Sequence, residues 1–367
     1  MGADVLVVGG GPAGIATAIA ASLKGLRVVV ADARRPPIDK PCGEGLLPKA
    51  VEALKQIGIG LCSANAFPLS GFRFSYGNSL ASASIKAGTA FGARRTTLHQ
   101  LLIERGAEAG VSFSWGAHVS DFQSNGARVG STFIPCKWLI GADGQNSGVR
   151  KWARLKSRGA VFSRFGFRRH FLVQPWTDFV EVHWGDRCQM VFTPISQGEI
   201  CLSVFTSDSR IRISEALEQF PEASKRLLRA RGSTPEQGAV TTLERAESVV
   251  RGRVAIVGDA SCSVDGIAGQ GLSLAFQQAG ALAEALARED LSSYEIAHRR
   301  ILRPAARMTR LLLLLDRLPW LRKRVLRVFA ANPALFSSMI GIHTGQTPRE
   351  IVPARELLDL GWQILRA

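Results

Sequence analysis

The chain has 367 residues, of which 46% are hydrophobic and 21% charged, so it is long enough for two or three domains with sizeable cores. Lys and Arg outnumber Asp and Glu by 46 to 30, which gives a net charge of +16. Because no nucleic-acid-binding motif accompanies this charge, we expect no nucleic-acid partner. An anionic membrane or an acidic ligand remains to be considered. The six cysteines are scattered without a CxxC pair, which argues against zinc and disulfides, so we expect no metal and a reducing, cytoplasmic location.

The first predicted element is a buried strand over residues 4–8, with no secretory leader before it. A glycine-rich turn follows at once. Gly9 permits the tight turn, Gly11 lets the backbone approach a pyrophosphate, and Gly14 lets the next helix pack closely on the strand. Pro12 suits the first turn of that helix, where its missing N–H is not needed.

A helix over residues 13–23 would point its N-terminus at the phosphates. The second buried strand, residues 26–31, ends at Asp32, whose carboxylate would accept hydrogen bonds from a ribose diol. Strand, turn, helix, strand and acid together predict a dinucleotide site, although this motif does not separate NAD from FAD.

The next segment is a loop of sequence KPCGEGLLP over residues 40–48. Cys42 in this loop is either a redox nucleophile, which would need a partner thiol or an activating cation, or a structural residue. Glu44 is either an acid/base group or a hydrogen-bonding group of the loop.

Further strands are predicted on both sides of a region with a different pattern. We predict a helix over 93–109, strands over 111–115 and 133–140, a strand over 254–257 and a long helix over 271–288. Between them, residues 180–205 alternate in the manner of antiparallel strands, and residues 71–92 have the same character. The buried strands therefore belong to a discontinuous domain, with an antiparallel sheet inserted into it.

The C-terminal region is basic and leucine-rich. Leu311 to Leu315 form an apolar run among ten Lys and Arg from Arg299 to Arg327, opposed only by Asp316. We predict either a helical bundle with a solvated basic face or an amphipathic surface that touches lipid or admits a lipid-like substrate. No apolar stretch reaches the roughly 18 residues that span a bilayer.

Three glycine-acid signatures occur in one order along the chain. They are Gly9 to Gly14 with Asp32, Gly141 to Gly144, and Gly258-Asp259 followed by Gly269-Gln270-Gly271. This ordered set resembles the group A flavoprotein family, which includes p-hydroxybenzoate hydroxylase-like monooxygenases and geranylgeranyl reductase-like enzymes. The resemblance covers roughly residues 1–290 and implies bound FAD, with NAD(P)H as a co-substrate that has no domain of its own.

The resemblance also implies roles for matching residues. The first turn would cradle the FAD pyrophosphate, and Asp32 would hold the adenosine ribose. Arg95 would approach the phosphates or the ribityl chain, and Val119 would meet the adenine. Asp143 would support both the FAD and its reaction with the pyridine nucleotide.

Asp259 would contact the ribityl hydroxyls, and the helix start after Gly269 would bring N–H groups and partial positive charge to the flavin. The predicted cofactor-binding residues are Gly9, Gly11, Pro12, Ala13, Gly14, Asp32, Ala33, Arg34, Cys42, Gly43, Arg95, Val119, Asp143, Gly144, Asp259, Gly269, Gly271 and Leu272. Gly266 stands where many members have a proline, so we expect a more mobile loop before this helix.

The expected fold is α/β: a Rossmann-type FAD-binding domain with an inserted antiparallel-sheet substrate domain and a C-terminal helical region. The expected boundaries are 1–70, 93–160 and 246–290 for the first, 71–92 and 161–245 for the second, and 291–367 for the third. Candidate substrate contacts are Glu44, His170, His183 and Phe192, although a histidine in a sheet is more often structural. No catalytic residue stands out.

The resemblance favours an FAD-dependent monooxygenase that uses NAD(P)H and O₂ to hydroxylate an aromatic or phenolic substrate of lipid-like or polyketide character. A first alternative is reduction of isoprenoid double bonds, as in geranylgeranyl reductases. Against it, Val191-Phe192-Thr193-Pro194 stands where an aromatic-rich segment is expected. A second alternative is a non-redox lipid carrier of the same fold. Peripheral membrane contact through the basic C-terminal region is a further expectation.

Overall fold

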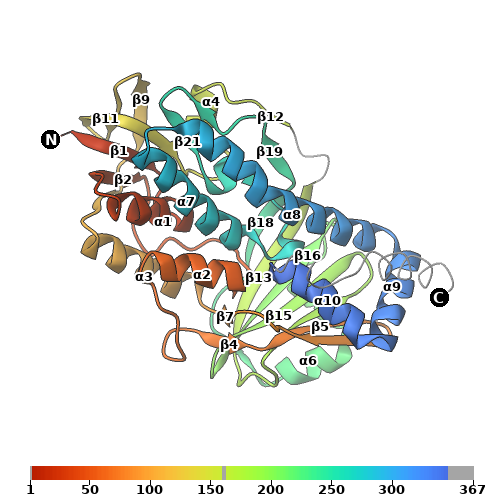
Figure 1. Ribbon diagram of the computed structural model, residues 1–367. Helices are drawn as coiled ribbons and strands as arrows, with labels where there is room; N and C mark the ends of the chain where they lie inside the picture. The colour runs from red at the N-terminus through yellow and green to blue at the C-terminus, as the bar shows by residue number, and fades with distance from the viewer. Residues whose placement is uncertain (1, 159–162, 346–367) are drawn as a thin grey trace.

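The computed structural model describes residues 2–158 and 163–345, which form two large sheets and a group of helices (Figure 1). The first sheet contains the buried strands that the sequence predicts. Its spatial order is β20 (Val250–Arg251), β21 (Val254–Ile256), β11 (Thr132–Gly141), β1 (Ala3–Val8), β2 (Val28–Asp32) and β8 (Ser112–Trp115). β1 pairs in parallel with both β11 and β2, and β9 (Val119–Gln123) and β10 (Gly126–Val129) extend from β11 as antiparallel strands.

Helices cover this sheet because its strands are apolar on both faces. Val5, Leu6 and Val7 are fully buried. The helices are α1 (Pro12–Ser22), α2 (Pro48–Gln56), α3 (Arg95–Glu108), α4 (Gly148–Trp152) and α7 (Gly271–Ala287). The helices predicted over 93–109 and 271–288 are confirmed as α3 and α7.

The second sheet is mostly antiparallel. Its spatial order is β17 (Arg231–Gly232), β13 (Ser163–Leu172), β16 (Glu199–Thr206), β15 (Cys188–Ser196), β14 (Phe179–Trp184), β5 (Gly71–Tyr76) and β6 (Ser79–Ser84), with β18 (Gln237–Thr242) also on β13. β5 pairs with β14 in parallel, which the long chain between them permits. Two short helices, α5 (Ile213–Glu218) and α6 (Pro221–Leu227), follow β16.

Two small sheets join these parts. One contains β3 (Gly45–Leu46), β7 (Ala90–Gly92) and β4 (Phe67–Leu69), and the other contains β12 (Ser157–Arg158), β19 (Glu244–Ala246) and β22 (Cys262–Ser263). Thus β7, expected in the substrate sheet with the rest of 71–92, pairs with β3 beside the 40–48 loop instead. Two short 3₁₀ turns, η1 (Gly258–Ala260) and η2 (Gly266–Ala268), follow β21.

The C-terminal region is helical, as predicted, through α8 (Leu291–Arg317), α9 (Pro319–Ala331) and α10 (Pro333–Thr344). In Figure 1, α8 leads away from the first sheet, and α9 and α10 lie beside the second. Leu312, Leu313 and Leu315 are buried, whereas Leu311 and Leu314 are exposed, so the leucine run is both a packing face and a surface. Residues 346–367 lie outside the described part.

The α/β fold class, with its Rossmann-type sheet, antiparallel sheet and C-terminal helices, is confirmed. The domain boundaries remain a prediction. Within residues 2–158 and 163–345, no single helix has the length and apolarity to cross a membrane; α9 and α10 pass that test only as a pair bent by 111°.

Candidate functional site

A cavity of about 1390 Å³ extends from the first sheet to the space between the second sheet and the C-terminal helices. Its walls include all the predicted cofactor-binding residues except Gly14. A Cβ atom on Gly14 would lie 1.9 Å from the carbonyl oxygen of Gly9, so this glycine allows α1 to pack on β1, as the sequence predicts.

The glycine turn leaves room for a ligand. Gly9 has φ +110°, and a Cβ on it would lie 2.4 Å from the carbonyl oxygen of Ala142. By contrast, a Cβ on Gly11 would meet nothing within 4 Å, and the backbone there borders the cavity at the start of α1. An open backbone at a helix N-terminus fits a phosphate group.

Asp32 is fixed by the turn that it faces. Its Oδ2 accepts a hydrogen bond from Gly10 N (2.8 Å), and its Oδ1 accepts one from Arg34 N (2.8 Å). Each carboxylate oxygen has a further lone pair, and Asp32, Ala33 and Arg34 all border the cavity. The geometry fits an acceptor for a sugar diol.

His99 supports the glycine turn from outside the cavity wall, and the sequence analysis did not predict this contact. It is buried, and its Nε2 donates to the carbonyl oxygen of Gly10 (2.8 Å). Burial lowers the pKa of this imidazole, which favours the neutral form. The available signal was its spacing of four from Arg95 on α3, which places both side chains on one helix face.

Arg95 reaches the cavity wall from the start of α3. Its Nε is buried and has no hydrogen-bond partner in the protein, and its backbone N donates to Glu44 Oε1 (2.9 Å). A buried guanidinium donor without a partner needs an acceptor. Together with the open space at Gly11, it fits an anionic cofactor.

Asp143 holds its own loop. It accepts hydrogen bonds from Ser147 Oγ (2.5 Å), Gly148 N (2.7 Å) and Val149 N (3.2 Å), at the N-terminus of α4. The next residue, Gly144, has φ +84° and borders the cavity. Any cofactor contact of this motif therefore comes from a loop that the Asp143 side chain shapes.

Asp259 forms an ion pair with Lys40, with 2.7 Å between Oδ2 and Nζ, and both residues border the cavity. The 17-residue helix α7 begins beside them at Gly271, after Gly269 in a left-handed conformation. The positive end of the α7 dipole thus faces the cavity. Val119, on β9, lines another part of the wall.

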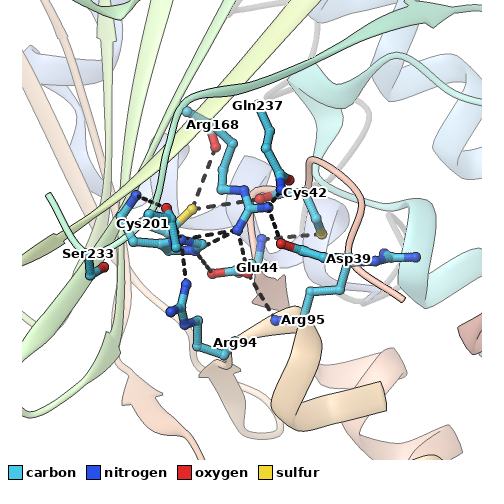
Figure 2. A network of polar contacts seen from close by, with 12 residues as sticks. Asp39, Cys42, Glu44, Arg94, Arg95, Arg168, Cys201, Ser233 and Gln237 are labelled. Carbon is cyan, nitrogen blue, oxygen red and sulfur yellow. Dashed lines mark hydrogen bonds and ion pairs between the residues drawn. The ribbon is translucent and has the colours of Figure 1, made fainter. Parts of the chain in front are cut away.

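A buried polar network lies next to the 40–48 loop (Figure 2). Glu44 has φ +59°, rare for a residue with a side chain, and is 1% exposed. His170 Nε2 lies 2.6 Å from Glu44 Oε2, and Arg94 Nη1 lies 2.5 Å from His170 Nδ1. Because a guanidinium only donates, Nδ1 accepts and Nε2 carries the proton that bonds Glu44.

Arg168 enters the same network from β13. It lies 3.6 Å from Glu44 Oε1 and bonds Asp39 Oδ2 (2.9 Å) and Gln237. Ligand atoms of Glu44, His170 and Cys201 lie within 4.8 Å of one another, but the neighbouring guanidinium disfavours a cation there. Burial raises the pKa of the Cys201 thiol, which disfavours the thiolate form that binds metals.

Of the four candidate substrate residues, only Glu44, in the 40–48 loop, borders the cavity, and the other three lie on strands of the second sheet. Glu44 borders the cavity; His170 lies in the network behind it; His183 and Phe192 lie outside the cavity wall. His183 packs instead against Phe192 and Phe220. Successive residues of a strand point to opposite faces, and Val182 and Val191 are the neighbours that face the cavity.

The part of the cavity away from the glycine turn is apolar. The second sheet contributes Phe72, Phe74, Val180, Val182, Trp184 and Val191, and the helices contribute Met308, Leu311, Leu312, Leu315, Val325, Leu326, Phe329, Phe336, Met339 and Ile340. We call this part the apolar chamber. Thr193 and Ser203, both buried, also border the cavity on strands of the second sheet.

A family model described as an FAD binding domain matches residues 2–290. Menaquinone reductase from Mycobacterium tuberculosis is 30% identical over 327 residues, covering 79% of this chain and 78% of that protein. Para-nitrophenol 4-monooxygenase from Pseudomonas sp. (strain WBC-3) is 25% identical over 343 residues, covering 81% and 83%. A solved flavoprotein/dehydrogenase from Cytophaga hutchinsonii shares the fold, with a TM-score of 0.80, 16% identity and coverage of 94% and 93%.

Proposed function

Because the chain belongs to the FAD-binding domain family, whose members are FAD-dependent oxidoreductases, we propose that it hydroxylates an aromatic ring carrying a long apolar chain, such as a phenolic lipid. NAD(P)H and O₂ are the co-substrates typical of this family. The observation that carries the proposal is that one continuous cavity joins the glycine turn to the apolar chamber. Similarity to a nitrophenol monooxygenase supports the hydroxylase assignment.

When bound, FAD would supply the redox chemistry, which is hydride acceptance from NAD(P)H and activation of O₂. The residues proposed to hold it are the glycine turn for the pyrophosphate, Asp32 for the ribose and Arg95 for the anionic phosphates. The N-terminus of α7 would favour negative charge on the reduced ring. The protein then contributes orientation and exclusion of water.

The chamber selects the substrate by its apolar body. A chain lying among Val182, Leu315 and Phe329 would lose apolar surface from water, at about 0.8 kcal/mol for each buried CH₂. Thr193 and Ser203 offer buried hydroxyls to a phenol group. We propose that these hydroxyls orient the ring while the chain lies in the chamber.

Oxygen consumption and product mass test this function. The purified enzyme with FAD and NAD(P)H should consume O₂ faster when a long-chain alkylphenol is added, and the product should be heavier by one oxygen atom. A short-chain phenol is the matched comparison and should require a higher concentration. NAD(P)H oxidation that no phenol stimulates, with recovery of unchanged phenol, contradicts the proposal.

A second candidate, reduction of an isoprenoid double bond, is favoured by two observations. Cys42 and Gly43 border the cavity, and the chain is 30% identical to a menaquinone reductase over most of its length. The same assay separates the two functions, because a reduced product gains two hydrogens and no oxygen. The carrier alternative is not retained, since the family consists of FAD-dependent enzymes.

A further inference from the structure

One face of α8 carries arginines that give way to apolar residues. Arg300, Arg303, Arg307, Leu311 and Leu314 are exposed, and their spacing of three or four places them on one side of the helix. Arg310 and, at the start of α9, Trp320 are also exposed. We call these seven residues the basic-apolar stripe.

Within residues 2–158 and 163–345, the arginines of the stripe have no ionic partner. Arg300, Arg303, Arg307 and Arg310 form no ion pair among the described residues. The acidic residues of α8 are engaged elsewhere: Glu295 bonds Ser248, Val249 and Arg299, and Asp316 pairs with Arg164. The stripe therefore presents positive charge without a neighbouring carboxylate on its helix.

The stripe also reaches the mouth of the cavity. Leu311 is 38% exposed to solvent and yet borders the cavity, together with Met308 and Leu312 from the same helix. Leu314, three residues further along α8, is 44% exposed, and Trp320 at the start of α9 is 57% exposed. Large apolar side chains at an opening, next to arginines, match the two layers of a lipid surface: acyl chains and anionic headgroups.

We propose that the basic-apolar stripe docks on the surface of an anionic lipid bilayer, so that the apolar chamber opens toward the membrane at Leu311. The arginines would contact headgroups, and Leu314 and Trp320 would enter the acyl boundary. The inference rests on the proposed function because it assumes an apolar substrate, but docking itself can be measured without turnover. An acidic protein would attract the arginines without using the exposed leucines and tryptophan, which is why we favour lipid.

Vesicle co-sedimentation tests docking directly. We expect the FAD-loaded protein to sediment with vesicles of phosphatidylglycerol and phosphatidylcholine, much less with phosphatidylcholine alone, and less at high salt. Each basic residue contributes about 1 kcal/mol at such a surface, so Arg303→Ser with Arg307→Ser should weaken binding about thirtyfold. The matched control is Arg229→Ser with Arg231→Ser, which removes two exposed arginines from another face and should change binding far less.

A second pair of variants tests the apolar half. Leu314→Ser with Trp320→Ser should lower vesicle binding, whereas Leu228→Ser, at a leucine that is 78% exposed on another face, should not. Quenching of tryptophan fluorescence by lipids brominated on their acyl chains should be lost in Trp320→Phe. Two outcomes overturn lipid docking. If the stripe and control arginine variants lose vesicle binding equally, diffuse positive charge explains the binding. If the arginine variants weaken binding but the Leu314 and Trp320 variants do not, the stripe fits an acidic protein instead.

Activity then separates this inference from the proposed function. If both hold, Arg303→Ser with Arg307→Ser slows turnover of a long-chain substrate in anionic vesicles but not of a soluble short-chain phenol. If vesicles bind but no phenol is turned over, docking stands and the proposed function fails. If soluble phenols are turned over and no vesicle binds, the docking inference fails alone.

Discussion

Asp32 combines two tasks, because it accepts hydrogen bonds from Gly10 and Arg34 and faces the cavity. We expect Asp32→Ala to weaken FAD binding, since a charge-assisted hydrogen bond contributes about 1.5–3 kcal/mol, or about ten- to a hundredfold in affinity. Titration of the apoprotein with FAD, followed by flavin fluorescence, measures it. Asp32→Asn keeps an acceptor and should lose less; equal affinity of wild type and Asp32→Ala contradicts the assignment.

Glu44 is the acidic centre of a buried network, with His170, Arg168 and the backbone N of Arg95 around it. We expect Glu44→Ala to lower the free energy of unfolding by about 2–6 kcal/mol, because the buried N–H groups of His170 and Arg95 lose their acceptor, at about 1–3 kcal/mol for each unsatisfied group. Urea unfolding of the FAD-loaded protein measures this.

Glu289→Ala is the matched control for Glu44→Ala. Glu289 also has a positive φ of 56°, but its side chain is 64% exposed in a surface pair with Lys137, so its loss should cost under about 1 kcal/mol. Alanine keeps the Cβ, so the positive-φ strain is unchanged in both variants; if both unfold alike, the buried network adds no measurable stability at Glu44.

At this scale, the sequence predicted the residues whose roles are local and missed those set by tertiary contacts. Gly9, Gly11 and Asp32 follow from a strand-turn-helix pattern that a short segment contains whole. His99 meets Gly10 only after α3 packs on the glycine turn. The side on which His183 and Phe192 lie depends on register, and β14 and β15 are largely buried on both faces, so alternation alone does not identify the cavity face.

Among the elements, α8 is joined to the first sheet by a buried histidine. His298, 2% exposed, bonds Ser261 Oγ after η1 (3.0 Å), and burial lowers the pKa of its imidazole from 6.5 to about 4. The folded protein therefore resists protonation that the unfolded chain accepts near pH 6.5. The stability from this group is complete above pH 6.5 and is lost as the pH falls toward 4, about 3 kcal/mol in total.

We expect His298→Gln to remove this pH dependence. The difference in free energy of unfolding between wild type and variant, measured by urea titration at several pH values, should narrow from pH 7 to pH 4. A difference that stays constant over this interval would show that His298 does not titrate on unfolding.

The elements that the sequence predicted best are those whose burial leaves continuous apolar runs, such as β1, β2 and β21. The partner of β7 could not be predicted, because three residues carry too little pattern to choose between the second sheet and β3. The leucine run of α8 likewise lies partly in the core and partly at the surface. Its periodicity alone does not predict which leucines are buried, because that depends on the elements packed against α8.

For the whole molecule, the apolar chamber should determine substrate length. Val182 points from β14 into the chamber, so Val182→Trp should fill part of it and raise the KM for a long-chain phenol while leaving FAD content unchanged. Leu228→Trp, at an exposed position, is the control. If the KM of Val182→Trp for the long-chain phenol equals that of the wild type, the alkyl chain of the substrate does not lie in the chamber.

The order of strands in the first sheet has a consequence for synthesis on the ribosome. β21, at residues 254–256, pairs with β11 and completes the parallel sheet that β1 begins. Until that late segment emerges, β11 has an open edge, and open edges recruit other strands. A nascent chain arrested before β21 should therefore aggregate or need a chaperone, whereas one released after α7 has every strand of this sheet.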